Sequence, residues 1–346
     1  MIPNMKSRLS TTSCRLGIAS GDCTLEPTPS LATVDHLRFT GHETFACRYA
    51  WLPKAVRGVH ENSALFADVD MAMVTLGVGK NMVHAIRFWA EAAAVIEPLD
   101  GGKCYRVSDF GTALLGPNGC DPYMEDVRTL WLIHWKIAVN RRFRVFAWDF
   151  FLNQWQEPEI SGTSALAVLR RHMRGMDRAP LSESVLDQQF EIFLHSYVPT
   201  KGRKKGEVRE DNLDCPLVEL RLLKETGVRR LGGEKGERVE SIYAFRREAK
   251  KDITPGLFAY CLDDFWRTWH EDEKTLAFQF VLHGHCGPGQ IFKLPEDDLR
   301  ARCENLEQDS KGFFLFHESA MQPMIKRGEE NADQYLLSRV YGETND

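Results

Sequence analysis

The sequence contains none of the patterns that mark a membrane span, a secreted protein or a disulfide-stabilised scaffold. No stretch reaches the roughly 18 apolar residues that a bilayer-spanning helix requires, and the N-terminus shows no apolar signal segment. The nine cysteines are scattered, and no C-x-x-C pair of a structural zinc site occurs among them. These absences favour a protein without disulfides in a reducing cytoplasm.

Short signatures of common enzyme classes are absent as well. No G-x-S-x-G nucleophile motif occurs. Residues 77–81 read Gly-Val-Gly-Lys-Asn, and this spacing differs from that of a G-x-x-x-x-G-K-[ST] phosphate-binding loop. His283, His285 and Cys286 are residue types that bind metals, but no second ligand pair accompanies them. We therefore interpret residues 283–289 as a glycine-rich turn.

The charge of the chain is small in total and unevenly distributed. The 346 residues are 43% hydrophobic and 27% charged, which is typical of a globular protein of about two domains. The net charge of −5 argues against a nucleic-acid-binding protein, because such proteins are usually basic. However, residues 127–251 have a net charge of +7 and residues 253–346 a net charge of −8. We expect a polyanion to contact the basic segment, and the acidic segment to face solvent, a protein partner or a second copy in a homodimer.

The predicted fold class is α+β, mostly helical, in three segments. Residues 1–34 are predicted to be a flexible tail, residues 35–118 a winged-helix DNA-binding domain, and residues 119–346 a mainly helical α+β domain. Thr40-Gly41-His42-Glu43 matches a capping box at a helix start. Further helices at 61–75 and 80–96 are separated by a glycine turn, and a hairpin at 97–107 follows. Helix, turn, helix and hairpin is the order of a winged helix-turn-helix.

One face of the predicted helix 80–96 carries candidate DNA contacts. At 100° per residue, a polar stripe contains three potential donors to phosphates or base edges, and an apolar face carries Val83, Ile86, Ala90 and Ala93. The potential donors are Lys80, His84 and Arg87, and Asn81 lies beside them. The alternative is an ordinary amphipathic helix with a solvated face. The other candidate contacts in this domain are Arg48, Lys54, Lys103 and Arg106.

A basic segment with interleaved aromatic residues is a second candidate surface. Asp121-Pro122 predicts the start of a helix that runs to Val139, and residues 127–148 contain five basic and no acidic residues. The candidate DNA contacts are Arg141, Arg142 and Arg144, and the aromatic residues are Trp131, Trp135, Phe143, Phe146 and Trp148. A nucleic-acid track and a buried core with arginines at a helix C-terminus explain this pattern equally well.

The rest of the chain predicts a mixture of helices, strands and loops. Helices are expected at 182–197, 255–269 and 295–306, and strands at 242–245, 276–282 and 291–294. Residues 224–240 are polar and glycine-rich, which predicts a surface loop. No internal repeat is present.

Two groups of polar residues could carry out phosphodiester chemistry. His42 and Glu43 could serve as base and metal ligand, although a capping box with an exposed His42 explains them too. Asp121, Glu125 and Asp126 could bind Mg²⁺ or Mn²⁺, but they equally suit a helix N-terminus. The predicted catalytic residues are His42, Glu43 and Asp126, and the predicted metal ligands are Glu43, Asp121, Glu125 and Asp126.

Three long motifs resemble those of a bacterial family, over about residues 37–325. The first is Phe39-Thr-Gly-His-Glu-Thr-Phe45 with Arg48, Trp51 and Lys54. The second is Leu76-Gly-Val-Gly-Lys-Asn-Met-Val83 with Ile86-Arg-Phe-Trp89. The third is Asp121-Pro-Tyr-Met-Glu-Asp126 with Thr129-Leu-Trp131 and His134-Trp135. Weaker matches are Cys215-Pro-Leu-Val-Glu-Leu220 and Gly289-Gln-Ile-Phe292.

The family that these motifs resemble is that of the SspB-type DNA nickases of bacterial DNA phosphorothioation. Its members occur beside cysteine desulfurase and phosphoadenosine-phosphosulfate-reductase-like proteins. The resemblance implies an anti-phage defence protein that binds double-stranded DNA and nicks one strand, so that sulfur can replace a non-bridging phosphate oxygen. The chain departs from the expected pattern at Arg221, where glycine is expected, and at Gln290, where arginine is expected.

Two other functions fit the same residues. A winged-helix adaptor without chemistry could bring sulfur-transfer partners to DNA. A transcriptional regulator would share the N-terminal fold, but it leaves residues 119–346 unexplained.

Overall fold

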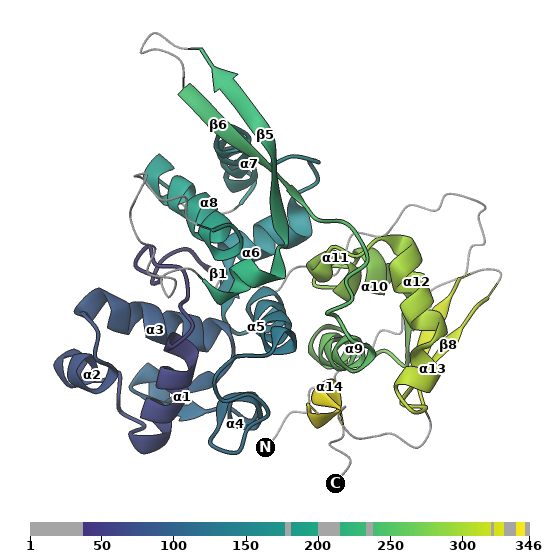
Figure 1. Ribbon diagram of the computed structural model, residues 1–346, viewed down its shortest axis with the longest axis horizontal. Helices are drawn as coiled ribbons and strands as arrows, with labels where there is room; N and C mark the ends of the chain where they lie inside the picture. Colours follow the sequence, from purple (N-terminus) through teal and green to yellow (C-terminus); the bar gives the residue numbers. More distant parts are fainter. Residues whose placement is uncertain are drawn as a thin grey trace, which may run out of the picture. The chain divides into compact units, whose positions relative to one another are not determined.

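The computed structural model describes residues 37–176, 181–199, 215–232, 238–319, 322–328 and 337–342. They belong to a compact unit, His36–Asp346, and the predicted tail of residues 1–34 lies outside the described residues. The fold class is α+β, as predicted, with many helices and small sheets (Figure 1).

The N-terminal helices and hairpin follow each other in the predicted order. The elements are α1 Trp51–Glu61, α2 Val69–Leu76, α3 Lys80–Ala92, β2 Ile96–Leu99 and β3 Cys104–Val107. Asp68 starts α2 because its side chain accepts from two backbone N–H groups, and Gly77 ends α2 in a left-handed conformation with a φ of 65°. The hairpin turn is a short 3₁₀ segment, Asp100–Gly102, and α4, Asp109–Leu115, follows it.

The predicted capping box at Thr40–Glu43 is wrong, because this segment forms turns and α1 begins later. Gly41, Glu43 and Thr44 have φ values of 112°, 50° and 63°. These left-handed values are incompatible with a helix start. Pro53 lies in the first turn of α1, where its missing N–H costs no intrahelical hydrogen bond.

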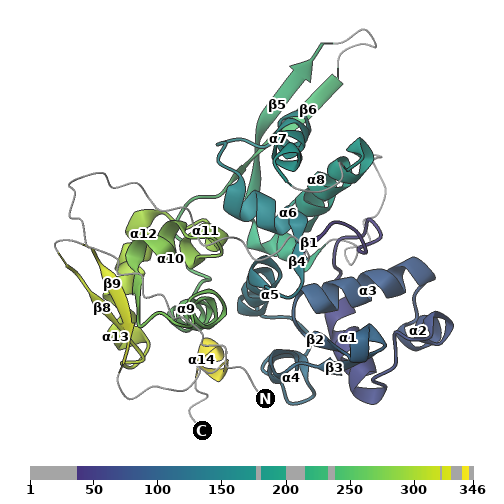
Figure 2. The same cartoon turned by 180° about the vertical axis from the view of Figure 1, so that it is seen from behind.

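The central element is α5, Val127–Val139, which lies between α3 and α9 in the views of Figures 1 and 2. Asp126 is its N-cap residue, so the predicted start at Asp121-Pro122 is too early. Almost every residue of α5 is buried, which requires other elements on all its faces. The following segment contains β4 Arg144–Val145, α6 Phe146–Trp148 and a π-helix, η3 Asp149–Gln154. β1, Leu37–Arg38, pairs with β4 in parallel.

Residues 224–240, which we predict to be a loop, contain most of an antiparallel hairpin. Its strands are β5 Leu223–Leu231 and β6 Arg238–Phe245. The hairpin extends past α7, Gly162–Arg174, and α8, Glu183–Tyr197 (Figure 1). The side chains from Lys224 to Arg230 are all exposed. The strand therefore lacks the apolar alternation by which a sequence indicates a half-buried strand.

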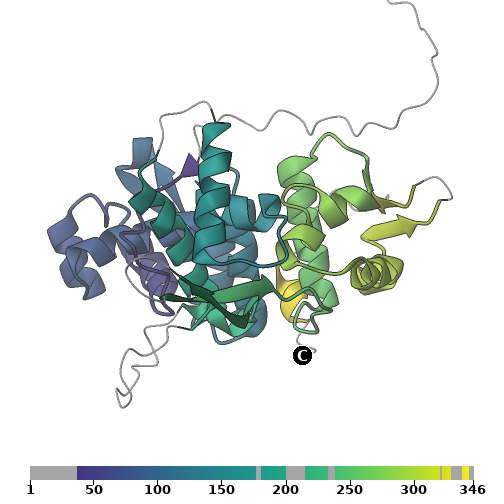
Figure 3. The same cartoon turned by 90° about the horizontal axis from the view of Figure 1, so that it is seen from above.

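Two predicted strands are partly helical in the structure. Residues 276–282 belong to β7 Thr275–Ala277 and α10 Phe278–His283, and residues 291–294 overlap α11 Pro288–Phe292. These short runs are almost entirely apolar, and such runs have no period that distinguishes a strand from a helix. In Figure 3 the teal elements lie in the middle, with the purple N-terminal elements on one side and the yellow-green C-terminal elements on the other.

α9, Pro255–Trp269, has the predicted bounds, and α13 Leu306–Asp309 and α14 Ser338–Tyr341 pack against it. The 3₁₀-helix η4, Pro216–Leu220, packs against α5 and α8. The remaining elements are α12 Glu296–Glu304, β8 Phe314–His317 and β9 Met324–Arg327. One sheet has the strand order β7-β9-β8. A continuous hydrophobic core includes residues from Phe39 to Val340. Over the described ranges, no helix combines the length and hydropathy needed to span a bilayer.

A chain of hydrogen bonds satisfies the polar groups that α5 carries into the core. Trp148 Nε1 donates to Tyr197 Oη at 2.7 Å, and Tyr197 Oη donates to His134 Nδ1 at 2.6 Å. His134 Nε2 donates to the carbonyl oxygen of Ile291 at 3.2 Å. Burial lowers the pKa of His134 to about 3, so the ring is neutral at physiological pH and Nδ1 can accept. The chain links α5 to α6, α8 and α11.

Replacement of Tyr197 by Phe tests the contribution of this chain to stability. The variant leaves a donor on Trp148 and an acceptor on His134 unpaired in the core, so the free energy of unfolding should fall by about 1–3 kcal/mol. Urea unfolding measures this change. Tyr123→Phe is the control, because Tyr123 is 68% exposed and should change the free energy by less than about 0.5 kcal/mol. Equal stability of the two variants would contradict a stabilising role for these hydrogen bonds.

Candidate functional site

The polar face of α3 is accessible to a large ligand. Lys80 and Asn81 are exposed, and His84 and Arg87 are partly exposed. Arg87 Nε lies 3.8 Å from Glu91 Oε1, one helical turn further on. The predicted apolar face is buried, with Val83, Ile86, Ala90 and Ala93 each no more than 1% exposed. The sequence-based division of α3 into two faces is therefore confirmed.

The other predicted DNA contacts of the N-terminal segment lie in or beside the hairpin and α1. Lys103 is exposed beside the hairpin turn, and Arg106 pairs across the strands with Glu97 at 2.7 Å. Lys54 Nζ donates to the last carbonyl of α2 at 2.9 Å, so it joins α1 to α2. Arg48 lies over the rings of Phe45 and Trp51, 5.7 and 5.3 Å from their centroids.

Most of the basic segment at residues 127–148 belongs to the core. Its aromatic residues Trp131, Trp135, Phe146 and Trp148 are at most 1% exposed. The guanidinium of Arg144 is buried and lies 2.7 Å from Asp149 Oδ1, which disfavours the predicted contact of Arg144 with DNA. Arg141 and Arg142 are exposed after the end of α5 and stay candidate contacts.

His42 is buried, contrary to the expected exposed position. Its ring is 3% exposed and lies edge-on to Phe88 with centroids 5.5 Å apart. Nδ1 accepts the Thr44 N–H at 3.1 Å, so Nε2 carries the proton of the neutral ring. Burial lowers the pKa of His42 to about 4. His42 is therefore a neutral donor whose lone pair is occupied, which disfavours its predicted role as a base. Glu43, beside it, is exposed.

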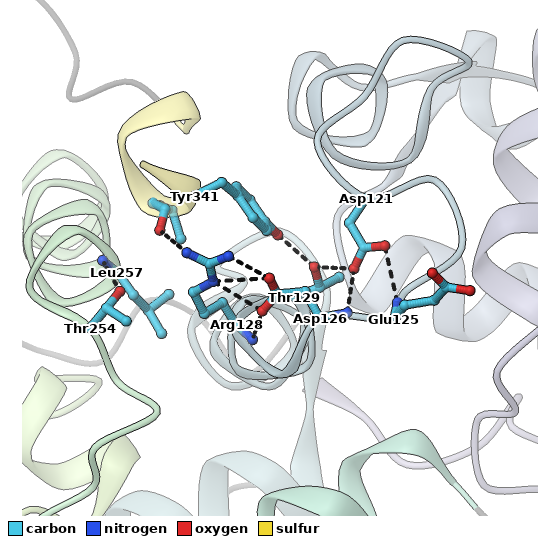
Figure 4. A network of polar contacts seen from close by, with 9 residues as sticks. Asp121, Glu125, Asp126, Arg128, Thr129, Thr254, Leu257 and Tyr341 are labelled. Atoms are coloured by element: carbon cyan, nitrogen blue, oxygen red, sulfur yellow. Dashed lines mark hydrogen bonds and ion pairs between the residues drawn. The ribbon is translucent and has the colours of Figure 1, made fainter. Parts of the chain in front are cut away.

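Figure 4 shows the carboxylates that precede α5. Asp121 accepts three hydrogen bonds, from the backbone N–H groups of Glu125 at 3.0 Å and Asp126 at 2.9 Å, and from Thr129 Oγ1 at 2.6 Å. Thr129 Oγ1 also lies 2.6 Å from the hydroxyl of Tyr341. Glu125 is exposed. Both oxygens of Asp121 thus stabilise the turn before α5.

Asp126 is paired with Arg128. Its carboxylate accepts the Arg128 backbone N–H at 2.8 Å and lies 2.5 Å from the guanidinium. Hydrogen bonds from Arg128 lower the pKa of Asp126. Arg128 also donates to the carbonyl of Val340 at 3.2 Å and lies over the ring of Tyr341. The pair therefore starts α5 and attaches α14 to it.

The two halves of the predicted catalytic site lie at opposite ends of α5. His42 contacts Phe88, whose ring lies 5.1 Å from that of Phe143, just beyond the end of α5. Asp126 lies at the other end, and a 13-residue helix is about 20 Å long. The structure does not bring His42 and Glu43 together with Asp126. In the described part of the chain, no three His, Cys, Asp or Glu residues form a group that could hold a metal.

A His–Asp pair near the end of α5, with Asp149 buried and His285 partly exposed, was missed as a unit by sequence reasoning. Asp149 Oδ1 accepts from Arg144 Nη2 at 2.7 Å and lies 2.9 Å from His285 Nε2. His285 is next to Cys286, whose Sγ lies 3.7 Å from the carbonyl oxygen of Ala138 in α5. Asp149 and His285 are 136 residues apart in sequence. No local motif could have connected them.

These features define an α+β protein with an exposed helix face that carries cations beside a hairpin, and a buried helix with a polar network at each end. A family model matches residues 39–341, and the chain belongs to this family, described as a protein of unknown function (DUF4007). A crystal structure of magnesium-ion-bound SspB has a TM-score of 0.72 and 25% sequence identity, and the match covers 85% of both chains. A second SspB crystal structure has a TM-score of 0.70 and 25% identity, over 85% of this chain and 84% of that one. No curated protein sequence matches.

The two departures from the expected family pattern occupy defined positions. Arg221 ends η4 in a left-handed conformation, with a φ of 48°. Glycine adopts this conformation at the lowest cost, which explains an expected glycine there. Gln290 Nε2 donates to the carbonyl oxygen of Asn153 at 3.2 Å, so it joins α11 to η3.

Substitution of Asp121 by Asn distinguishes a structural carboxylate from a metal ligand. The amide nitrogen of Asn would meet N–H donors, so the free energy of unfolding should fall by about 1–3 kcal/mol. The fall should be the same with Mg²⁺ and with chelator. Thermal unfolding measures it, with Glu125→Gln as the exposed control. Stabilisation of the wild type by Mg²⁺ that Asp121→Asn abolishes would make Asp121 a metal ligand.

Proposed function

We propose that this SspB-like protein binds double-stranded DNA and nicks one strand in the course of DNA phosphorothioation. The observation that carries the proposal is the exposed cationic face of α3 beside the β2–β3 hairpin. Its occurrence in a chain with the SspB fold connects that face to a DNA-modifying system. The net charge of +7 over residues 127–251 is consistent with a polyanionic ligand.

In this proposal the N-terminal elements act as a winged helix. The start of α3 enters the major groove, where Lys80 and Asn81 reach base edges or phosphates. Lys103, beside the hairpin turn, contacts the backbone. Arg106 exchanges Glu97 for a phosphate, because an exposed ion pair contributes little stability. Arg142, beyond α5, extends the contact along the duplex.

A Lys80→Ala/Arg87→Ala double variant tests the proposed DNA face. Each lost phosphate contact should reduce the slope of log affinity against log salt by about 0.9, so the double variant should bind more weakly and with a slope lower by about 2. Fluorescence anisotropy with duplex DNA over a salt series measures both. Lys274→Ala/Lys326→Ala removes two exposed cations from the acidic C-terminal segment and is the matched control. An unchanged slope in the first variant excludes α3 from the interface.

The magnesium-bound state of SspB supports a divalent-metal requirement for nicking. The carboxylates before α5 do not fit the ion, because Asp121 is occupied by N–H and O–H donors and Asp126 by Arg128. Mg²⁺ is commonly held by one or two carboxylates together with waters and substrate phosphates. Glu43 is the carboxylate that we propose for this role, because it is exposed on a strained loop that packs against α3.

Relaxation of supercoiled plasmid tests the enzymatic function. The wild type should produce open circles with Mg²⁺ or Mn²⁺ and not with chelator. Glu43→Gln should lower the rate at least about tenfold, because a neutral amide is a weaker ligand for a hard cation. Glu61→Gln is the control, because Glu61 is exposed at the C-terminal end of α1. Undiminished nicking by Glu43→Gln refutes the role of Glu43 as a metal ligand. Loss of nicking by Asp126→Asn without loss of stability would show that Asp126 is a catalytic residue.

A non-catalytic adaptor is the second candidate function. The observation that favours it is the separation of His42 and Glu43 from Asp126 by the length of α5. Such an adaptor would present DNA to the cysteine desulfurase and the phosphoadenosine-phosphosulfate-reductase-like protein, and its acidic C-terminal segment would face these partners or a homodimer mate. DNA binding by the wild type without nicking would favour this function.

A further inference from the structure

The Asp149–His285 pair has a defined direction of hydrogen bonding. Burial raises the pKa of Asp149, but the hydrogen bonds and charges of His285 and Arg144 outweigh this effect and hold the pKa below its usual value. Asp149 is therefore a carboxylate, and a carboxylate can only accept. His285 Nε2 must donate, so the lone pair of an imidazole that acts as a base lies on Nδ1. No hydrogen bond to Nδ1 occurs among the described residues.

The local backbone holds the pair in a fixed position. Asp149 begins η3, and such π-helical turns are frequent at functional sites. Asp149 Oδ2 also accepts from Gln154 Nε2 at 3.1 Å. On the other side, Cys286 has a left-handed φ of 61°, and its N–H donates to Asn153 Oδ1 at 2.7 Å. Asp149 is thus part of η3, and the residue after His285 is hydrogen-bonded to η3.

The glycines around His285 allow this close packing. A Cβ atom on Gly284 would lie 2.3 Å from the carbonyl oxygen of Phe280, and one on Gly287 would lie 2.5 Å from it. These distances are far below van der Waals contact, so larger residues would displace the turn that carries His285. The glycine-rich turn predicted for this segment is therefore a scaffold for the imidazole.

The imidazole is the accessible end of the network. The side chain of His285 is 19% exposed, against 6% for Asp149 and 8% for Arg144. The ring of Trp269 lies edge-on to His285 with centroids 5.1 Å apart, and the guanidinium of Arg141 lies 5.8 Å from the centroid of Trp269. Arg141, an exposed cation that can hold a phosphate, therefore contacts the same Trp269 ring that contacts His285.

We propose that His285 is the general base of strand nicking and that Asp149 and Arg144 are its positioning residues; this assignment rests on the proposed function. As the oxygen of a water molecule forms a bond to phosphorus, the proton of the water moves to Nδ1 of His285. The bond from phosphorus to one sugar oxygen breaks, and that oxygen takes a proton from solvent. Arg141 binds a non-bridging oxygen of the same or the adjacent phosphate.

Single-turnover nicking of supercoiled plasmid with Mg²⁺ by the full-length protein tests the assignment. His285→Ala should lower the rate by about 10²–10⁴-fold without changing DNA affinity, because a general base contributes a factor of this size. Free imidazole added to this variant should restore part of the rate. His283→Ala is the matched control, since His283 is exposed two residues away. His285→Gln and thermal unfolding of every variant report on folding.

The outcomes separate the two levels of the proposal. Nicking by His285→Ala at the wild-type rate overturns the role of His285 and leaves the nicking function intact. A loss that imidazole does not restore indicates a structural role and also overturns the assignment. If the wild type does not nick with Mg²⁺ or Mn²⁺, the proposed function and the general base fail together. Asp149→Asn should lower the rate even when imidazole is added, because the disturbed His285 still occupies the base position.

Discussion

Burial of α5 is the constraint on which the rest of the structure depends. A helix that is apolar on all faces must be covered on all faces, and η4, α9 and α11 pack against it. Its few polar side chains then need partners inside the protein, because an unpaired buried polar group is costly. Thr129 bonds to Asp121, His134 takes part in a chain to Tyr197, and Lys136 bonds to Asp264 at 2.6 Å.

The same helix separates the polar residues into two groups with different roles. At its start, Asp121 and Asp126 are occupied by backbone donors and by Arg128, and their effect is to begin α5 and attach α14. Beyond its end, Arg141 is exposed and His285 is partly exposed on a rigid support. Asp121 and Asp126 resemble a metal site in the sequence, but their contacts hold the start of α5. The oriented imidazole of His285 comes from a segment that the sequence indicates only as a turn.

The sequence-based predictions succeeded where interactions are local along the chain and failed where they join distant residues. Helices with local start and stop signals were predicted well, such as α9 with Thr254-Pro255 at its start and α8 with Ser182 as its N-cap. The motif at residues 40–43 has the residue types of a capping box, but left-handed backbone conformations and packing against Phe88 override it. β5 was missed because its pairing with β6 is made by the backbone, which leaves no side-chain period.

The sequence by itself determined the α+β class, the two faces of α3, the order of the N-terminal helices and hairpin, and the resemblance to the SspB family. These properties depend on short-range periodicity and on contiguous motifs, which can be read along the chain. The tertiary structure alone decided that Arg144 is buried, that His42 is a neutral donor, and that Asp149 meets His285. Burial and pairing between residues more than 100 positions apart depend on how elements pack, and no local pattern encodes that packing.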